Sequence, residues 1–303
     1  MAGAPVVTIV RDDGLGEGNP RFVIDGTRWF LVNGGLEGFD GVGYEVSTGD
    51  YAQYDGAYLL GERSGTVDRT ITARALVGRF AARREAEQFF VARRSYEVHV
   101  EYAGRSRYFV GRQYGFRLSV DPGDGVQELV WTALALDPCW LSEDEKRFDL
   151  AEAEGKAGFA FCSWGARKSP PGFVHVAGFV AGVIRREIWM DNAGGATAYP
   201  RFDVSATGEV KNPVIRILDA AGAEQMRVSL TVDLSAGDAL TFDFSARPTL
   251  VLLNGEDASH LVRPGSTLAA GVEPGRFQVV WSADEGDAAL SILPSIRERY
   301  ASV

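Results

Sequence analysis

The sequence predicts a mainly β protein with two domains. Its 303 residues suit two domains of ordinary size better than one. Glycine is frequent, at 36 residues, and 46% of the residues are hydrophobic while 24% are charged. The apolar residues occur in short runs separated by glycine-rich turns, which is the pattern of a chain built from many short strands.

The N-terminal half begins with strands joined by tight turns. In "RFVIDGTRWFLV", Asp25-Gly26 separates two apolar runs. This dipeptide is the strongest short signal of a β-hairpin, because glycine accepts the positive φ that a type I′ turn requires. We therefore expect the two runs to pair with each other.

The segment "VDRTITARALV" predicts a strand with one buried face. Apolar and polar residues alternate along it, as they do where one side of a strand faces a core. The predicted buried face contains Val67, Arg69, Ile71, Ala73 and Ala75.

One segment, "FAARREAEQFFVARR", predicts a single helix at about residues 80–94. Its apolar residues recur at helical spacing and form one stripe of Ala82, Ala86, Phe89 and Phe90. Arg93 and Arg94 would lie in the last turn, where positive charge suits the helix dipole.

The C-terminal half predicts an antiparallel β-sandwich, because short strands follow one another at spacings of about 8 to 12 residues. "MRVSLTVDL" alternates from Met226 to Leu234 and predicts one strand. "TLVLLNGEDASHLV" turns at Asn254-Gly255, and "RFQVVWSADEGDAALSIL" predicts another hairpin through "ADEGD". Pro213 has no N–H group, so we expect it at the start of a strand or at a sheet edge.

The charged run "SEDEKR" marks the boundary between the two halves. We place an N-terminal β domain at residues 1–141, a linker at 142–148 and a C-terminal sandwich at 149–303. The predicted fold class is thus mainly β, with two sandwich-like domains of which the first carries the helix.

The charge of the chain restricts its partners. It has 31 basic and 41 acidic residues, which gives a formal net charge of -10. A surface that binds nucleic acid or an anionic membrane needs clustered Lys and Arg, so we expect neither kind of binding. We see no signal peptide and no run of roughly 18 to 20 apolar residues, so we expect a soluble protein made in the cytoplasm.

No constellation of catalytic or metal-binding residues is visible in the sequence. The three histidines, His99, His175 and His260, are scattered, and none has the i, i+4 spacing of a zinc helix. Neither cysteine, Cys139 or Cys162, has a histidine near it in the sequence. No G-x-S-x-G motif is present to expose a nucleophilic serine. We therefore expect no enzyme, no cofactor and no metal site.

A pair of carboxylates of the glycosidase type stays open as an alternative, because an acidic chain offers many candidates. Asp137 and Asp149 flank the predicted boundary, but solvation of the linker explains these two residues better.

The six tryptophans raise a second alternative, a module that binds host cell-wall polysaccharide. Trp131, Trp189 and Trp281 lie in alternating strands, where packing between sheets is the expected role. A sugar-binding module would need another, exposed tryptophan in a groove, and Trp140 and Trp164 are the candidates.

A glycine- and tyrosine-rich segment stands out because it has no clean period. Its large residues are Tyr51, Tyr54, Tyr58, Leu59 and Leu60. Tyrosine is enriched at protein interfaces, so the segment predicts a protruding arm that docks on a neighbouring subunit. Burial of these residues within their own domain is the competing interpretation.

The order of several segments resembles one protein family. They are "VDRTITARALVG", "FAARREAEQFFVARR", "LVWTALALDPCW", "IWMDNAGGATAYPRFDVSATGEVKNPVIRI" and "FQVVWSADEGDAALSILPSIRERY". Together, over nearly the whole chain, they resemble the distal tail protein of bacteriophages with long, non-contractile tails.

The resemblance implies a homo-hexameric ring at the tail tip and a galectin-like C-terminal sandwich that projects outward. As partners it implies the tail tube protein, the tail-associated hub or lysin protein, and receptor-binding proteins. DNA and the tape-measure protein would pass through the lumen without specific binding. The expected location is the tail tip of the virion, after assembly in the host cytoplasm.

Overall fold

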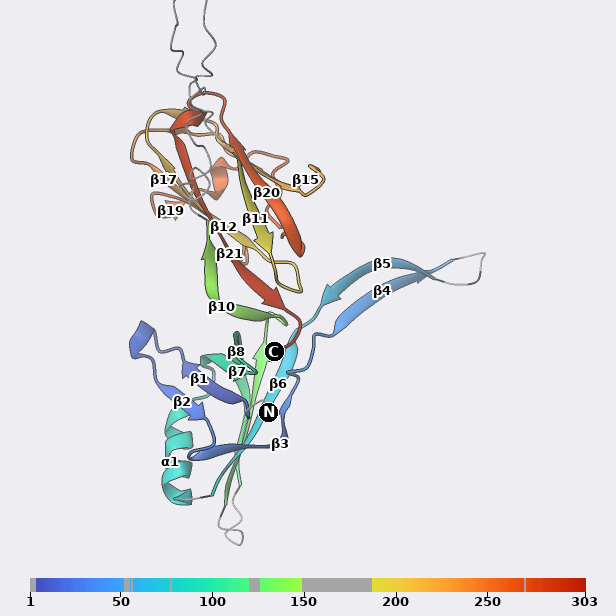
Figure 1. Ribbon diagram of the computed structural model, residues 1–303, viewed down its shortest axis with the longest axis vertical. Coiled ribbons are helices and arrows are strands. Elements are labelled where there is room, and N and C mark those ends of the chain that lie inside the picture. The colour runs from blue at the N-terminus through green and yellow to red at the C-terminus, as the bar shows by residue number, and fades with distance from the viewer. Residues whose placement is uncertain are drawn as a thin grey trace, which may run out of the picture. The chain divides into compact units, whose positions relative to one another are not determined.

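The computed structural model describes residues 4–51, 55, 57–76, 78–119, 126–148, 187–269 and 271–303 (Figure 1). The chain forms two compact units. The N-terminal unit contains the described residues up to Asp144, together with Gly194–Ala196 and Glu298–Val303. The C-terminal unit contains the other described residues.

The predicted linker, 142–148, lies mostly in strand β10 (Trp140–Arg147). The division between the units falls inside this strand, after Asp144. The domain limits proposed from the sequence stay a prediction.

The N-terminal unit is built on one antiparallel sheet with the order β3-β6-β9-β8-β7-β1-β2. β10 continues from β9 along one edge of β8, where Leu141 pairs with Tyr108. The elements are β1 (Val6–Arg11), η1 (Gly16–Gly18), β2 (Arg21–Ile24), β3 (Trp29–Glu37), β4 (Tyr44–Asp50), β5 (Ala57–Ser64), β6 (Val67–Ala75), α1 (Arg79–Phe89), β7 (Ser95–Tyr102), β8 (Arg105–Leu118) and β9 (Gln127–Ala135).

Strand β6 has the buried face that its alternation predicts. Ile71, Ala73 and Ala75 are fully buried, and so is Arg69. The guanidinium of Arg69 lies 4.3 Å from the ring of Phe109 and 4.2 Å from that of Trp140. Burial lowers the pKa of Arg69 to about 10.

The core accommodates Arg69 without a direct carboxylate partner among the described residues. Its Nη2 donates to the Pro138 carbonyl at 2.5 Å and its Nε to the Gly38 carbonyl at 3.3 Å, while its Nη1 is buried without a hydrogen bond. Since a buried charge is expensive and the rings supply packing on both sides, the main contribution of this side chain is its contact area.

We therefore expect Arg69→Met to leave the free energy of unfolding within about 1 kcal/mol of the parent value, or to raise it, because methionine fills the space between the two rings without a charge. Arg69→Ala should lower it by about 3 kcal/mol, since a cavity remains. Urea unfolding of both variants checks this. A methionine variant as unstable as the alanine variant would show that the charge itself holds the core.

The predicted single α-helix is present, but its C-terminal limit is wrong. α1 ends at Phe89, and Phe90 has an extended backbone with φ −83° and ψ 94°. The ring of Phe90 turns into the core, 5.6 Å from that of Trp131. The Tyr96 hydroxyl also accepts a bond from the N–H of Val91 at 2.7 Å. Arg93, at φ 68°, follows this turn, so the expected helix-dipole role of Arg93 and Arg94 is wrong too.

The first predicted hairpin is half right. Gly26 has φ 85° and its N–H donates to the Trp29 carbonyl, so the chain turns where Asp25-Gly26 predicts. The strands on either side then pair elsewhere: β2 with β1 and β3 with β6. The turn dipeptide fixes the local backbone, but it does not choose the neighbouring strand.

The C-terminal unit is a sandwich of two antiparallel sheets. One has the order β19-β18-β17-β12-β21 and the other β11-β20-β14-β15. The elements are β11 (Glu187–Asn192), β12 (Pro200–Ala206), β13 (Val210–Lys211), β14 (Val214–Asp219), β15 (Glu224–Ser229), β16 (Asp233–Leu234), β17 (Ala239–Asp243), β18 (Leu250–Leu253), β19 (Glu256–Asp257), η2 (Ser259–Leu261), β20 (Gly275–Ser282), η3 (Asp287–Ala289) and β21 (Leu290–Tyr300).

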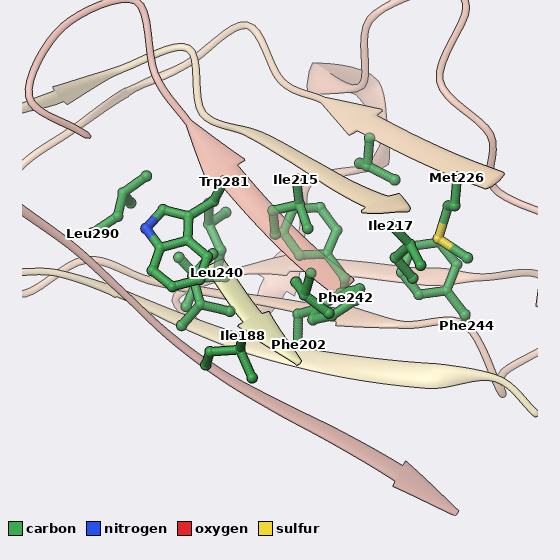
Figure 2. Close-up of a cluster of buried hydrophobic side chains, with 14 of the residues drawn as sticks. Ile188, Phe202, Ile215, Ile217, Met226, Leu240, Phe242, Phe244, Trp281 and Leu290 are labelled. Atoms are coloured by element: carbon green, nitrogen blue, oxygen red, sulfur yellow. The ribbon is translucent and has the colours of Figure 1, made fainter. Parts of the chain in front are cut away.

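The inner faces of the two sheets meet in one core (Figure 2). Phe202 and Phe242 enter it from one sheet, and Ile217 and Trp281 enter it from the other. The prediction of a mainly β chain with one α-helix is thus confirmed for the described residues, while the galectin-like character of the sandwich stays a prediction.

The strand expected from Met226 to Leu234 is interrupted. β15 pairs with β14, whereas β16 pairs with β13. Between them the N–H of Leu230 bonds to the Pro213 carbonyl and that of Thr231 to the Leu261 carbonyl, so the chain changes neighbours. Pro213 itself directly precedes β14, as expected for a residue without an N–H group.

The two remaining hairpin predictions have opposite outcomes. Asn254-Gly255 joins β18 to β19 with both residues at positive φ, which confirms that hairpin. The "ADEGD" hairpin is wrong, because β20 and β21 belong to different sheets. Gly286 in this connection has φ 76°, and a Cβ there would lie 1.9 Å from the Glu209 carbonyl oxygen, so the crossing requires glycine.

Candidate assembly surface

Strands β4 and β5 form a separate ribbon, which we call the arm (residues 44–64). In the described part of the chain they pair with each other and with no third strand. The arm leaves the sheet after β3 and returns at β6, and it projects from that side of the N-terminal unit (Figure 1). Its position makes it available to another molecule.

The arm exposes the large residues that the sequence singled out. Tyr51 is 50% exposed, Tyr58 43%, Leu59 59% and Leu60 62%. Tyr54 lies outside the described residues. These values fit a docking arm better than burial within the same domain, although contact with a second subunit stays a prediction.

The arm has two different faces. The register pairs Gly49 with Tyr58 and Thr48 with Leu59, so the tyrosine and the leucine point to opposite sides. The Tyr58 ring lies 5.2 Å from that of Tyr51. A Cβ at Gly49 would be only 2.7 Å from Tyr58 Cζ, so the ring lies across the bare glycine backbone.

A second apolar surface, the sheet patch, lies on the outer face of β8 and β9. It consists of Val110 and Tyr114 on β8, Leu134 on β9 and Leu136 directly after β9. Arg112 and Asp68 pair in register with Leu134 on its two sides, so charged residues border the patch. Tyr114 is 62% exposed and Leu136 70%. The Tyr114 hydroxyl donates to Asp68 Oδ2 at 2.7 Å, and this bond raises the pKa of the phenol.

Sequence reasoning missed the sheet patch, although a signal was present. In "LVWTALAL" both alternating sets are mostly apolar: Trp131 and Ala133 face the core, while Val130 and Leu134 face outward and only Thr132 between them is polar. A strand with one solvated face carries polar residues there, so apolar residues on both sides indicate a second surface to be covered.

The tryptophan predictions have mixed outcomes. Trp131 and Trp281 are buried as expected, but Trp189 is 40% exposed, because it lies on the outer face of the edge strand β11. Trp140 is fully buried and cannot stack on a sugar. Trp164 lies outside the described residues, so the polysaccharide alternative gains no support from either candidate.

The other candidate residues do not form a reactive group. His99 Nδ1 lies 2.8 Å from Glu143 Oε1, as expected for a hydrogen-bonded histidine on a strand. Asp137 accepts a hydrogen bond from Arg299. Burial raises the pKa of the Cys139 thiol. His175, Cys162 and Asp149 lie outside the described residues.

The described part of the chain contains no group of three or more His, Cys, Asp or Glu side chains placed to hold a metal ion. None of its helices combines the length and the apolarity needed to span a bilayer.

No protein-family model matches the chain, and no curated protein matches it in sequence. Several solved structures, in contrast, are similar to the chain in fold. The crystal structure of the SPP1 Dit (gp 19.1) protein, described as a paradigm of the hub adsorption apparatus in phages infecting Gram-positive hosts, superposes with a TM-score of 0.61 at 12% identity, covering 97% of this chain and 98% of that one.

A chain of the phage P2 baseplate in its activated conformation with calcium gives a TM-score of 0.56 at 10% identity, covering 99% of this chain and 100% of that one. The same baseplate with strontium gives 0.55. At these identities the likeness concerns the fold. The chain has the fold of these phage tail proteins over almost its entire length.

Proposed function

We propose that the chain is a structural component of a phage tail tip and that six copies close into a ring. The observation that carries this proposal is the likeness to SPP1 Dit, which extends over both units of the chain. A protein in this role holds other proteins in place and transforms no substrate, which agrees with the lack of a reactive constellation in the sequence.

The ring contact that we propose joins the arm of one copy to the sheet patch of the next. A closed ring needs a heterologous contact, in which two different surfaces of each copy meet. The N-terminal unit supplies two such surfaces, the arm with Tyr58 and Leu59 and the patch with Tyr114 and Leu136. Covering exposed apolar surface of this kind favours association.

In the proposed assembly the ring joins the tail tube protein to the hub or lysin protein and carries receptor-binding proteins. DNA and the tape-measure protein pass through its lumen. The net charge of -10 supports passage without binding, since a lumen wall of acidic proteins does not attract phosphates. The site of action is the tail of the virion, after assembly in the host cytoplasm.

The mass of the purified chain in solution tests the proposal. Sedimentation equilibrium should give about six times the 32.8 kDa of one chain. A species of one chain at every concentration up to the solubility limit would contradict ring formation, because the contact would then require another protein.

A further inference from the structure

The outer face of the sheet β11-β20-β14-β15 carries three arginines in an unusual arrangement. Arg216 on β14 pairs in register with Arg227 on β15, and Arg276 lies on β20 between β11 and β14. We call this surface, together with Trp189, the arginine face. It belongs entirely to the C-terminal unit.

In the part of the chain that the structure describes, Arg216 and Arg227 face each other in register and no carboxylate stands opposite either of them. Directly opposite side chains on neighbouring antiparallel strands are about 5 Å apart at Cβ, and like charges there are destabilising. Among the described residues no carboxylate lies within ion-pair distance of Arg216, Arg227 or Arg276. The Nε of Arg216 is also buried without a hydrogen-bond partner.

Acidic residues offset the charge of Arg276 but not that of the Arg216–Arg227 pair, since Asp191 stands opposite Arg276 in register and no acidic residue stands opposite Arg216 or Arg227 in the described ladders. Glu187 on the edge strand accepts a bond from Gln278 Nε2 at 2.6 Å. Asp191 pairs in register with Arg276, yet no ion pair joins their side chains. Although the net charge of the chain is -10, the described residues therefore leave the positive charges of Arg216 and Arg227 without an ion-pair partner.

Trp189 adds a second feature of an interaction surface. Its ring is 40% exposed, and the guanidinium of Arg276 stacks over it at 4.4 Å. Arg276 also borders a hollow of about 320 Å³ whose wall includes Gln225 and Phe277. The wall also includes the acidic residues Asp219 and Glu273, so carboxylates of a partner would contact the strand face and not this hollow. Exposed tryptophan and arginine that are already held in place are the residue types that dominate protein-protein binding energy.

We propose that the arginine face is the docking site of a partner protein that presents carboxylate side chains. Arg216 and Arg227 bind one carboxylate between them, and Arg276 binds a second while Trp189 packs against the apolar part of the partner. The occupant is a protein because the half-buried Leu218 and Val280 lie between the charged residues, and a polyanion without apolar groups leaves them uncovered. The inference does not rest on ring formation.

The proposal makes an unusual prediction for Arg227→Glu. In the free protein this change turns a repulsive pair into an attractive one, so the melting temperature should rise by about 1 to 2 °C. The same change should weaken binding of an acidic ligand about tenfold or more, because a bound carboxylate would face another. A fall in melting temperature would show that Arg227 serves the fold and would overturn the proposal.

A matched control is available on the other sheet of the same unit. Arg201 is an exposed arginine that already has an acidic partner, with its Nη2 3.0 Å from Asp203 Oδ1. Arg201→Glu makes the same change in net charge, but it should lower the melting temperature and leave ligand binding unchanged. Equal loss of binding in both variants would mean that the ligand senses only the overall charge, and the proposal would be wrong.

The probe is fluorescein-labelled hexaglutamate, with hexaglutamine as the uncharged comparison, and binding to the full chain is followed by anisotropy at low salt. We expect hexaglutamate to bind, hexaglutamine to fail, and Trp189→Ala to weaken binding severalfold. Inorganic phosphate is titrated in parallel. If phosphate raises the melting temperature through Arg216 and Arg227 while hexaglutamate does not bind, the face takes a phosphate-bearing polymer and the protein partner is excluded.

Discussion

A chain with serine in place of Tyr58, Leu59 and Leu60 is expected to fold normally and to remain a single copy in solution. These side chains are 43% to 62% exposed in one chain, so their removal takes little from its own core. If each becomes buried in a neighbour, the contact loses roughly 1.5 to 3 kcal/mol per side chain. This loss of binding free energy occurs at every contact between neighbouring copies in a ring. We therefore expect the variant not to assemble.

Sedimentation velocity measures this result, and the melting temperature shows whether the variant folds. The matched control is Leu15→Ser, which removes a leucine that is 65% exposed but lies outside both the arm and the sheet patch. The control should assemble as the parent does. An arm variant that sediments at the parent mass would remove the arm from the interface.

Mixing two variants tests whether arm and patch bind each other. Leu136→Glu should also stop assembly, since it places a charge in the apolar sheet patch. The patch variant keeps an intact arm, and the arm variant keeps an intact patch. A mixture of the two variants therefore allows one contact between an arm and a patch. The mixture should form a dimer of the two variants and grow no further. A mixture of monomers would show that the two surfaces do not meet.

Removal of residues 298–303 is expected to destabilise the N-terminal unit, although it leaves every strand up to β9 intact. Glu298 is 6% exposed, and Tyr300 and Val303 pack against the core of that unit. The guanidinium of Arg107 lies 3.6 Å from the Tyr300 ring. Lost packing and hydrogen bonds should lower the free energy of unfolding by roughly 3 to 4 kcal/mol.

Hydrogen exchange of the β8 amides measures the loss where it should occur, and the sandwich amides serve as an internal reference. Tyr300→Phe is the matched variant, because it keeps the ring beneath Arg107 and removes only the bond from the hydroxyl to Glu298 Oε2. It should cost about 1 kcal/mol. Unchanged protection of β8 in the truncated chain would contradict the assignment of these residues to the N-terminal unit.

The sequence predicted the structure best where a single physical rule, such as alternation along a strand, determined the outcome. Alternation placed Arg69 on the buried face of β6 against the usual preference of arginine for water. It was right because strand geometry fixes the side of each residue regardless of type. α1 was located by its apolar stripe, but its end was missed because Phe90 and Tyr96 form the turn through contacts with the rest of the unit.

Pairing between strands was less predictable than the turns. Gly26, Gly255 and Gly286 all adopt positive φ, yet only Gly255 joins two strands that pair with each other. A turn signal describes a few residues of backbone, whereas the partner of a strand depends on which apolar faces can be covered together. The arm could be recognised in the sequence because apolar and polar residues do not alternate along it. The arginine face depends on the register of β14 and β15, which sequence alone does not fix.

Electron microscopy of the purified, unmodified chain tests ring formation most directly. Class averages of single particles should show one closed ring with sixfold symmetry and a central opening. Isolated single copies, or open chains that grow without closing, would contradict the account.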